Sequence, residues 1–179
     1  MSIRDEQPGD ADAVRAVNDA AFGQTTEGCI VDALRVNCDR LVSLVAVDGD
    51  AIVGHILFSP VELRSDAAAP ETSFSTRYPV AGMGLAPLAV TPAYQRRGIG
   101  SMLVREGLAR VRAMGAPYVV VLGHADYYPR FGFCSASTFG VRCPWDVRDE
   151  SFMLMESQKG ALQRLGGVVY YRPEFDAAV

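Results

Sequence analysis

The chain has 179 residues, of which 49% are hydrophobic and 21% are charged, a composition that suits one globular domain and excludes a disordered chain. Its 17 Lys and Arg against 21 Asp and Glu give a net charge of −4, which argues against broad, sequence-independent binding to nucleic acid. The sequence contains no apolar run long enough for a membrane span, and its first residues do not resemble a signal peptide. We therefore expect a single cytoplasmic domain over residues 1–179, with no membrane or nucleic-acid partner.

The cysteines and histidines do not form a metal-binding pattern. None of the cysteines belongs to a Cys-x-x-Cys pair, and the chain has only two histidines. Structural zinc sites need four such ligands at short, regular spacings. We therefore expect no metal, and we expect the thiols to be reduced, as is usual in the cytoplasm. The four cysteines are Cys29, Cys38, Cys134 and Cys143.

The N-terminal third predicts a short strand, two helices and a hairpin. After a strand at residues 2–4, apolar residues recur three or four apart between Asp10, a plausible N-cap, and Gly23, a helix terminator. The same spacing follows Thr25–Thr26, which offers a second N-cap. Two β-branched runs then flank the turn sequence Asp48-Gly49-Asp50, which predicts a β-hairpin over residues 41–58.

The middle of the chain contains a long polar segment and then a strand–helix–strand unit. Residues 65–79 are rich in alanine and polar residues, so we expect an exposed loop of a length that is often functional. A strand at 85–90 is followed by a helix from about Ile99 to Met114 and by a buried strand at 118–122. This order is typical of a βαβ-like crossover.

The C-terminal part predicts short elements that complete the sheet. We expect a one-turn helix at 126–130, a strand near Phe133, and two late strands at 152–156 and 168–172 that form an antiparallel pair. The whole pattern predicts an α/β (α+β) fold, with a mixed, largely antiparallel sheet and helices on both faces. The core would lie in about residues 1–136, and residues 137–179 would add the C-terminal strands.

The segment from Gln95 to Gly100 suggests an anion-binding turn. Gly98 and Gly100 stand between a strand and a helix, where glycine lets the backbone approach a ligand and turn its N–H groups outward. The positive end of the helix and the side chains of Arg96 and Arg97 favour a phosphate or diphosphate. A glycine turn with solvated arginines is the alternative. Neither a Walker A motif nor a Gly-x-Gly-x-x-Gly fingerprint is present.

Two motifs in the right order resemble those of the GCN5-related N-acetyltransferases, the GNAT superfamily. Gln95-Arg96-Arg97-Gly98-Ile99-Gly100 resembles the family's Q/R-x-x-G-x-G/A motif after a strand. Tyr127-Tyr128-Pro129-Arg130-Phe131-Gly132-Phe133 resembles its aromatic-Tyr-x-x-x-Gly-Phe signature. The resemblance covers most of the chain, and its specific motifs cover about a third of it. It implies the acyl-CoA N-acyltransferase fold and acetyl-CoA as co-substrate.

The resemblance implies which residues contact coenzyme A. The diphosphate would lie on the backbone N–H groups of residues 96–101, and the pantetheine arm would pair with the preceding strand. A β-bulge there would open a wedge for the thioester, and the N–H of Leu88 or Val90 would stabilise the oxyanion. The implied coenzyme-binding residues are Leu88, Ala89, Val90, Gln95, Arg96, Arg97, Gly98, Ile99, Gly100 and Ser101.

Tyr128 matches the family's general acid. Amine attack on a thioester expels a thiolate that needs a proton, and a phenol with a pKa of about 10 remains protonated at neutral pH. The alternative is an aromatic ring that only packs beside Phe131 and Phe133. Tyr127 is assigned this packing role.

The general base is not fixed by a motif. Glu27 borders the acceptor site in the family's first helical pair, so it would bind an ammonium group or act as base, with a solvated helix carboxylate as the alternative. Asp126 either contributes near the reaction centre or caps the short helix. His55 is expected to be a packed, hydrogen-bonded residue, and His124 is the better histidine candidate. Cys134 as an acyl carrier is less favoured than Cys134 as a small buried hydrophobe.

The function that the resemblance implies is acetyl transfer from acetyl-CoA to a primary amine, directly within a ternary complex. The acceptor would be a small molecule or a peptide, and homodimer formation is left open. One alternative is a non-catalytic acyl-CoA-binding sensor or regulatory module. Another keeps the transfer chemistry and uses a hydroxyl or other nucleophile as acceptor.

Overall fold

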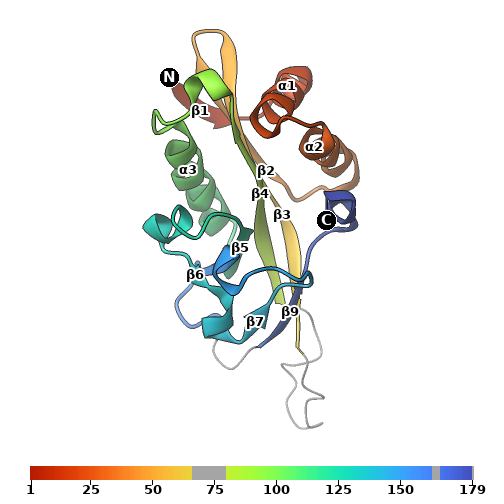
Figure 1. Ribbon diagram of the computed structural model, residues 1–179, viewed down its shortest axis with the longest axis vertical. Coiled ribbons are helices and arrows are strands. Elements are labelled where there is room, and N and C mark those ends of the chain that lie inside the picture. The colour runs from red at the N-terminus through yellow and green to blue at the C-terminus, as the bar shows by residue number, and fades with distance from the viewer. Residues whose placement is uncertain (66–79, 163–165, 179) are drawn as a thin grey trace. The chain divides into compact units, whose positions relative to one another are not determined.

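A computed structural model describes residues 1–65, 80–162 and 166–178, which form two compact units (Figure 1). The first unit comprises Met1–Ser59, Leu85–Ala113 and Pro173–Val179, and the second comprises Pro60–Gly84 and Met114–Arg172. Nearly all of the predicted loop at 65–79 lies outside the described residues. The expectation of a single domain therefore stays a prediction.

Four strands lie side by side in the sheet of the first unit. They are β1 (Ser2–Asp5), β2 (Val42–Asp48), the first part of β3 (Ala51–Arg64) and the end of β4 (Val80–Val90). The predicted hairpin is confirmed, because β2 and β3 pair antiparallel around a turn in which Gly49 has φ 61°. Strand β3 is longer than predicted, since apolar residues continue to alternate beyond Phe58.

Helices cover both faces of the strands in the first unit, with α1 (Ala11–Phe22) and α2 (Thr26–Asn37) on one side and α3 (Ile99–Ala113) on the other (Figure 1). Alternate residues of β3 face opposite helices, as the strand pleat requires. Gly54 lies against side chains of α3, whereas His55 contacts Asn18 of α1. Gly107 lies so close to the Phe58 ring that a Cβ at that position would overlap it. The prediction of helices on both faces is confirmed.

The predicted N-caps of α1 and α2 are partly wrong. Gly23 ends α1 with φ 71°, as predicted. Asp10 precedes α1 but already has helical backbone angles, and its side chain makes no cap hydrogen bond to that helix. Its carboxylate instead accepts hydrogen bonds from the Arg4 guanidinium and the Gln7 N–H, and the hydrogen bond from Arg4 lowers the pKa of Asp10. Thr25 likewise makes no side-chain cap.

The sheet continues in the second unit. Its strands are hydrogen-bonded neighbours in the order β3, β4, β5 (Tyr118–Leu122), β8 (Phe152–Glu156) and β6 (Cys134–Ser135). Strand β9 (Gly167–Tyr170) lies between β3 and β7 (Val141–Arg142). The predicted antiparallel pair of late strands is wrong, because β8 pairs with β5 and β6 while β9 pairs with β3 and β7. Each late strand is antiparallel to its longest neighbour, so the predicted mixed, largely antiparallel sheet is confirmed.

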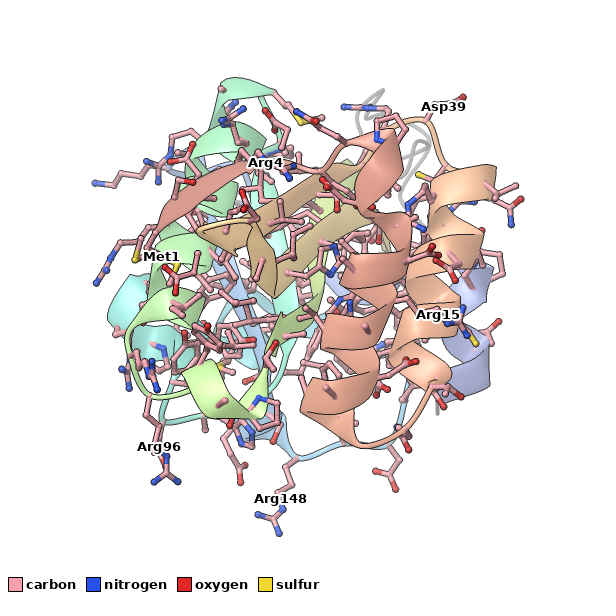
Figure 2. The ribbon with its side chains drawn as sticks, turned by 90° about the horizontal axis from the view of Figure 1, so that it is seen from above. Met1, Arg4, Arg15, Asp39, Arg96 and Arg148 are labelled. Carbon is pink, nitrogen blue, oxygen red and sulfur yellow. The ribbon has the colours of Figure 1, made fainter. Side chains whose placement is uncertain are left out.

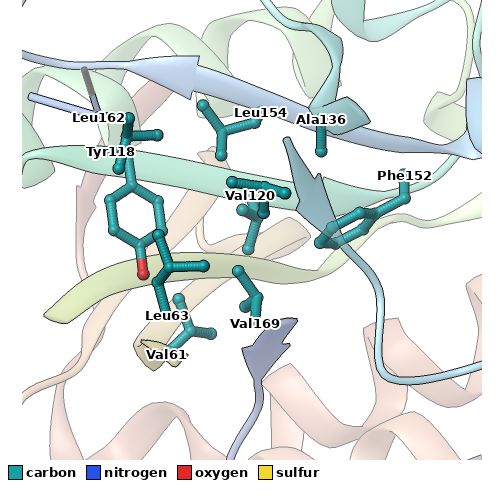
Figure 3. Packing of buried hydrophobic residues seen from close by; sticks show 10 residues of the cluster. Val61, Leu63, Tyr118, Val120, Ala136, Phe152, Leu154, Leu162 and Val169 are labelled. Carbon is teal, nitrogen blue, oxygen red and sulfur yellow. The ribbon is translucent and has the colours of Figure 1, made fainter. Parts of the chain in front are cut away.

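The core of the second unit is formed mainly by strand residues, joined by Ala136 and Leu162 from outside the strands (Figure 3). Tyr118 is fully buried, and its ring occupies the space that a side chain at Gly82 of β4 would need. Burial of apolar side chains provides the main stabilising free energy of such a cluster. Its members are Val61, Leu63, Tyr118, Val120, Ala136, Val141, Phe152, Leu154, Leu162 and Val169.

A chain of hydrogen bonds runs through the buried interior of the first unit. The Asn18 amide donates to Nδ1 of His55 (3.0 Å), which leaves Nε2 of His55 to donate to the Ser43 hydroxyl (2.9 Å). Ser43 in turn donates to Glu6, and Arg35 holds the other oxygen of that carboxylate. This arrangement confirms that His55 is a packed, hydrogen-bonded residue. It needs a neutral imidazole, since one ring nitrogen must accept.

No helix in the ranges 1–65, 80–162 and 166–178 is both long enough and apolar enough to cross a bilayer.

Protonation of His55 should destabilise the fold in mild acid. Burial, together with the nearby charge of Arg35, lowers the pKa of His55 to about 3, whereas the unfolded chain has a value of about 6.5. Below about pH 6.5 the imidazole of the unfolded chain binds a proton, whereas the imidazole of the folded chain stays neutral. The free energy of unfolding therefore falls by up to about 1.4 kcal/mol for each pH unit. Urea unfolding at pH 7, 6 and 5 should show a steeper pH dependence for the wild type than for His55→Gln. Equal slopes would contradict this interpretation.

Candidate active site

Hydrogen bonds hold the end of β4 in place just before the predicted anion-binding turn. The Thr91 N–H donates to the Val53 carbonyl of β3 (3.0 Å), and a 3-10 turn at Pro92–Tyr94 follows. The side-chain amide of Gln95 then donates back to the Val90 carbonyl (2.9 Å). Gln95 therefore shapes the turn through a bond to the protein.

The turn itself contains two residues in the left-handed region. Arg96 has φ 59° and is the one non-glycine residue with positive φ in the described part of the chain, and Gly98 has φ 85°. A non-glycine residue in this region carries strain and is a pointer to function. Left-handed residues next to right-handed ones turn successive N–H groups toward one point, which forms an anion-binding nest. Helix α3 begins directly behind, since the Met102 N–H bonds to the Gly98 carbonyl.

The surroundings of the turn are positive and exposed. Arg96 extends away from the ribbon (Figure 2), and the Arg97 guanidinium lies 5.2 Å from the centre of the Tyr94 ring. The N-terminal end of α3 adds a partial positive charge. Ile99, at 2% exposure, anchors the first residue of the helix in the core. The arrangement of N–H groups and cations suits a phosphate or diphosphate.

The last residues of β4 present an alternating surface. Ala89 is buried, whereas Leu88 and Val90 on either side of it are half-buried. Pro87 has no N–H, so β4 cannot donate a ladder hydrogen bond at that position. The predicted bulge and the oxyanion role of Leu88 or Val90 stay predictions.

Tyr128 is held in the second unit by aromatic packing and by a glycine. It opens a 3-10 turn, Tyr128–Phe131, that ends at Gly132 with φ 97°. Its ring makes edge contacts with Tyr127 (centroids 5.1 Å apart) and Phe133 (5.7 Å). A Cβ at Gly123 would lie 2.5 Å from the ring, so glycine is needed there.

Burial fixes the protonation state of Tyr128. The residue is 7% exposed, and burial, with a smaller effect from Tyr127, raises the pKa of its phenol well above the usual value. The group is therefore a neutral proton donor at physiological pH. Tyr127 packs on Phe131 (5.4 Å) and carries the Arg130 guanidinium over its ring, as its predicted packing role requires.

The acidic candidates are placed differently. Glu27 lies in the first turn of α2, and its carboxylate accepts hydrogen bonds of 3.1 and 3.2 Å from the Gln24 amide, a partner that the sequence did not suggest. Its role as base or ammonium ligand stays a prediction. Asp126 does not cap the short helix, because Tyr127 occupies the N-cap position. His124 and Asp126 are both exposed.

Cys134 is not the small buried residue that we expected. It is exposed because β6 has only two residues and is the last strand in the order, and its thiol lies 3.6 Å from the Thr138 hydroxyl. Among the described residues, no group of three His, Cys, Asp or Glu side chains is arranged to hold a metal ion.

Comparison with known families agrees with this local geometry. The sequence model of the Acetyltransferase (GNAT) family matches residues 12–133, which is more than half of the chain. The chain belongs to the GNAT family of acetyltransferases. This match confirms the predicted family, and the interval includes both motifs that carried the resemblance.

The relatives of this GNAT chain match most of its length. It is 32% identical to the uncharacterized N-acetyltransferase YhbS of Escherichia coli K12 over 177 residues, or 98% of this chain and 99% of the relative. The uncharacterized N-acetyltransferase YjhQ of the same strain is 37% identical over 145 residues, 79% of this chain and 74% of the relative. These relatives support N-acetyltransferase activity in this chain.

Solved structures of the family confirm the fold. YhbS from Escherichia coli, in complex with CoA, superposes with a TM-score of 0.87 at 31% identity, covering 98% of this chain and 91% of the other. A GNAT acetyltransferase from Brucella melitensis, in complex with acetyl-CoA, gives a TM-score of 0.75 at 36% identity, covering 98% and 97%. The predicted acyl-CoA N-acyltransferase fold is therefore confirmed.

Proposed function

We propose that this GNAT chain transfers acetyl from acetyl-CoA to a primary amine, directly within a ternary complex. The observation that carries the proposal is the pair of left-handed residues, Arg96 and Gly98, immediately before α3. Strain at a non-glycine residue persists only where surrounding structure maintains it, and here it would direct N–H groups toward an anion. The CoA and acetyl-CoA complexes of two similar proteins support the choice of ligand.

The diphosphate of acetyl-CoA would lie on the N–H groups of residues 96–101. The side chains of Arg96 and Arg97 would add electrostatic attraction without fixing the position of the diphosphate, and the Tyr94 ring would hold the Arg97 guanidinium. The pantetheine arm would follow β4 at Leu88, Ala89 and Val90, of which Leu88 and Val90 are half-buried. Backbone N–H groups bind phosphate oxygens at low entropic cost, because the turn is already ordered.

The chemistry would proceed through a tetrahedral intermediate. The amine nitrogen attacks the thioester carbonyl, the oxyanion receives a hydrogen bond from the N–H of Leu88 or Val90, and the C–S bond breaks. The departing thiolate takes the phenolic proton of Tyr128. The raised pKa of Tyr128 makes it a weak acid, but a thiolate formed away from water is correspondingly more basic. The surplus proton of the amine leaves to a base or to water.

The acceptor would be a small molecule or a peptide with a primary amine. Glu27 is our candidate for holding its ammonium group or accepting its proton, since Gln24 orients the carboxylate. The net charge of −4 also favours approach of a cationic acceptor.

Replacing Gly100 by aspartate should abolish CoA binding without harming the fold. A carboxylate in the first turn of α3 interacts favourably with the helix dipole and stabilises the helix by about 0.3–1 kcal/mol, yet it repels a diphosphate. Calorimetry with CoA should show no binding to Gly100→Asp and weakened binding to Gly100→Asn, which has the same bulk without the charge. Full CoA affinity in a folded Gly100→Asp variant would disprove the assigned turn.

Removing the hydroxyl of Tyr128 should slow the chemical step. Tyr128→Phe keeps the ring and its contacts with Tyr127 and Phe133, so stability and acetyl-CoA affinity should stay near the wild-type values. Thiol release should slow by roughly 10²–10⁴-fold, as expected for loss of a positioned acid. The matched control is Tyr127→Phe, which should retain most activity. A wild-type rate in Tyr128→Phe, with chemistry rate-limiting, would remove Tyr128 from the mechanism.

Neutralising Glu27 tests its assignment to the acceptor. Glu27→Gln should raise KM for the amine by roughly 10-fold, the loss of one partly exposed ionic hydrogen bond, and leave CoA affinity unchanged. Asp12→Asn, at the equivalent first turn of α1, serves as the control. Steady-state thiol release at varied amine concentration gives KM and kcat separately. If KM and kcat are both unchanged, Glu27 has no role at the acceptor site and is a surface carboxylate.

A further inference from the structure

Helix α1 crosses the sheet of the first unit in the direction of β4. Just before the helix, the Asp10 carboxylate accepts a hydrogen bond from Arg4 of β1 (3.0 Å). About two turns later, the Asn18 amide donates to His55 of β3 (3.0 Å). The strands follow the order β1, β2, β3, β4 and are spaced about 4.8 Å apart. One further turn, a rise of about 6 Å, therefore takes Phe22, the last residue of α1, from β3 toward β4.

The end of α1 lies near the start of the anion-binding turn. The segment that leads into α1 bonds to β2 opposite Leu57, and the helix then passes His55, so it advances along β3 toward Val53. The Val53 carbonyl accepts the N–H of Thr91, the residue that follows β4 (3.0 Å). In Figure 2 the turn between α1 and α2 lies toward the same edge as the turn that carries Arg96.

Phe22 and Glu27 occupy the last inward-facing positions at this end of the two helices. Phe22 follows the buried Asn18 by four residues, and Glu27 precedes the buried Ile30 and Val31 by three and four. Residues at these spacings share one face of a helix, here the face that covers the sheet. Phe22 is nevertheless 42% exposed and Glu27 is only half-buried. No other phenylalanine in the described part of the chain is exposed.

The two helices are in direct contact beside these residues. A Cβ at Gly28 would lie 2.5 Å from a carboxylate oxygen of Asp19, so there is no room for a side chain between the helices at this point. The axes of packed helices are about 8–10 Å apart. Phe22 comes one turn after Asp19, and Glu27 directly precedes Gly28. The ring and the carboxylate therefore lie on neighbouring helix ends, about one helix spacing from each other.

Glu27 is a half-buried carboxylate that no cation neutralises. Both of its oxygens accept hydrogen bonds from the neutral Gln24 amide, and it pairs with no arginine or lysine among the residues that the structure describes. A carboxylate that is partly removed from water is stabilised by a cation, so this position favours a cationic ligand. The other half-buried carboxylates of residues 1–37 each pair with an arginine: they are Glu6, Asp10, Asp19 and Asp32.

We propose that Phe22 is a specificity-determining residue of the acceptor site, and that the acceptors are primary amines with an aryl or branched alkyl group a few carbon atoms from the nitrogen. The ammonium group binds Glu27, and the apolar group packs on the Phe22 ring. This inference deepens the proposed function and rests on it. A free arylalkylamine and a peptide with an apolar first residue present the same chemistry, and the experiments below distinguish these two sources.

Fluorine NMR measures this site without turnover. The probe is 4-fluorophenethylamine, titrated into the full chain saturated with CoA. Phe22→Ala should weaken binding roughly 10-fold through loss of the apolar contact, and Phe22→Leu should retain most of the affinity. The matched control is Val36→Ala, which removes an exposed apolar side chain near the other end of α2 and should change nothing. Equal affinity in wild type and Phe22→Ala, or no binding to the wild type, would overturn the inference.

Thiol release from acetyl-CoA provides the second readout, with acceptors compared in pairs. One pair is 2-phenylethylamine and ethylamine, and the other is two tripeptides that begin with phenylalanine or alanine. For the pair that represents the true source, wild-type kcat/KM should favour the apolar member by roughly 10–100-fold, the value of burying one aromatic ring. Phe22→Ala should lose most of this preference, whereas Glu27→Gln should lower both members alike.

The kinetic outcomes separate the inference from the function on which it rests. An unchanged preference in Phe22→Ala, with thiol release intact, would overturn the role of Phe22 and leave acetyl transfer in place. If no amine of either pair causes thiol release, the proposed transfer is itself contradicted, and the inference falls with it.

Discussion

The close packing of α3 on β3 is the constraint on which the anion-binding turn depends. A Cβ at Gly54 would lie 3.1 Å from Leu103 and 3.2 Å from Ile99, and a Cβ at Gly107 would overlap Phe58. The helix therefore lies directly on the strand at both its first and third turns. Because Ile99 is both the first helical residue and a core residue, the turn before it cannot move without unpacking the core.

Burial sets protonation states in both units, with different consequences. In the first unit a neutral His55 joins Asn18 to Ser43 and Glu6, which links α1 to the strands. In the second unit burial keeps Tyr128 and Tyr171 as phenols. The histidine chain is directed toward a carboxylate and is satisfied at rest, whereas Tyr128 is the proton donor in the reaction that we propose. The first arrangement supports the fold, and the second suits chemistry.

Local sequence signals predicted much of this structure. The hairpin around Gly49, the end of α1 at Gly23 and the start of α3 after Gly98 each depend on a glycine and its immediate neighbours. Residues 98–100 and Tyr128 were recognisable because their motifs are contiguous in sequence. These features need no knowledge of distant contacts.

The features that sequence did not predict depend on distant residues. Asp10 bonds to Arg4 in place of capping its helix, and the partners of β8 and β9 are chosen by burial against strands far away in the chain. The left-handed Arg96 was unexpected, since non-glycine residues rarely adopt that conformation.

Acetyl transfer to an amine is the central claim, and carbon NMR with acetyl-CoA labelled at the acetyl carbonyl tests it most directly. With a panel of small amines and peptides, the account predicts that the thioester resonance is lost in the presence of an amine and replaced by an amide resonance, with one thiol released per amide formed. A thioester that persists across the whole panel while CoA still binds would contradict it, and would indicate a protein that binds acyl-CoA without transferring the acyl group.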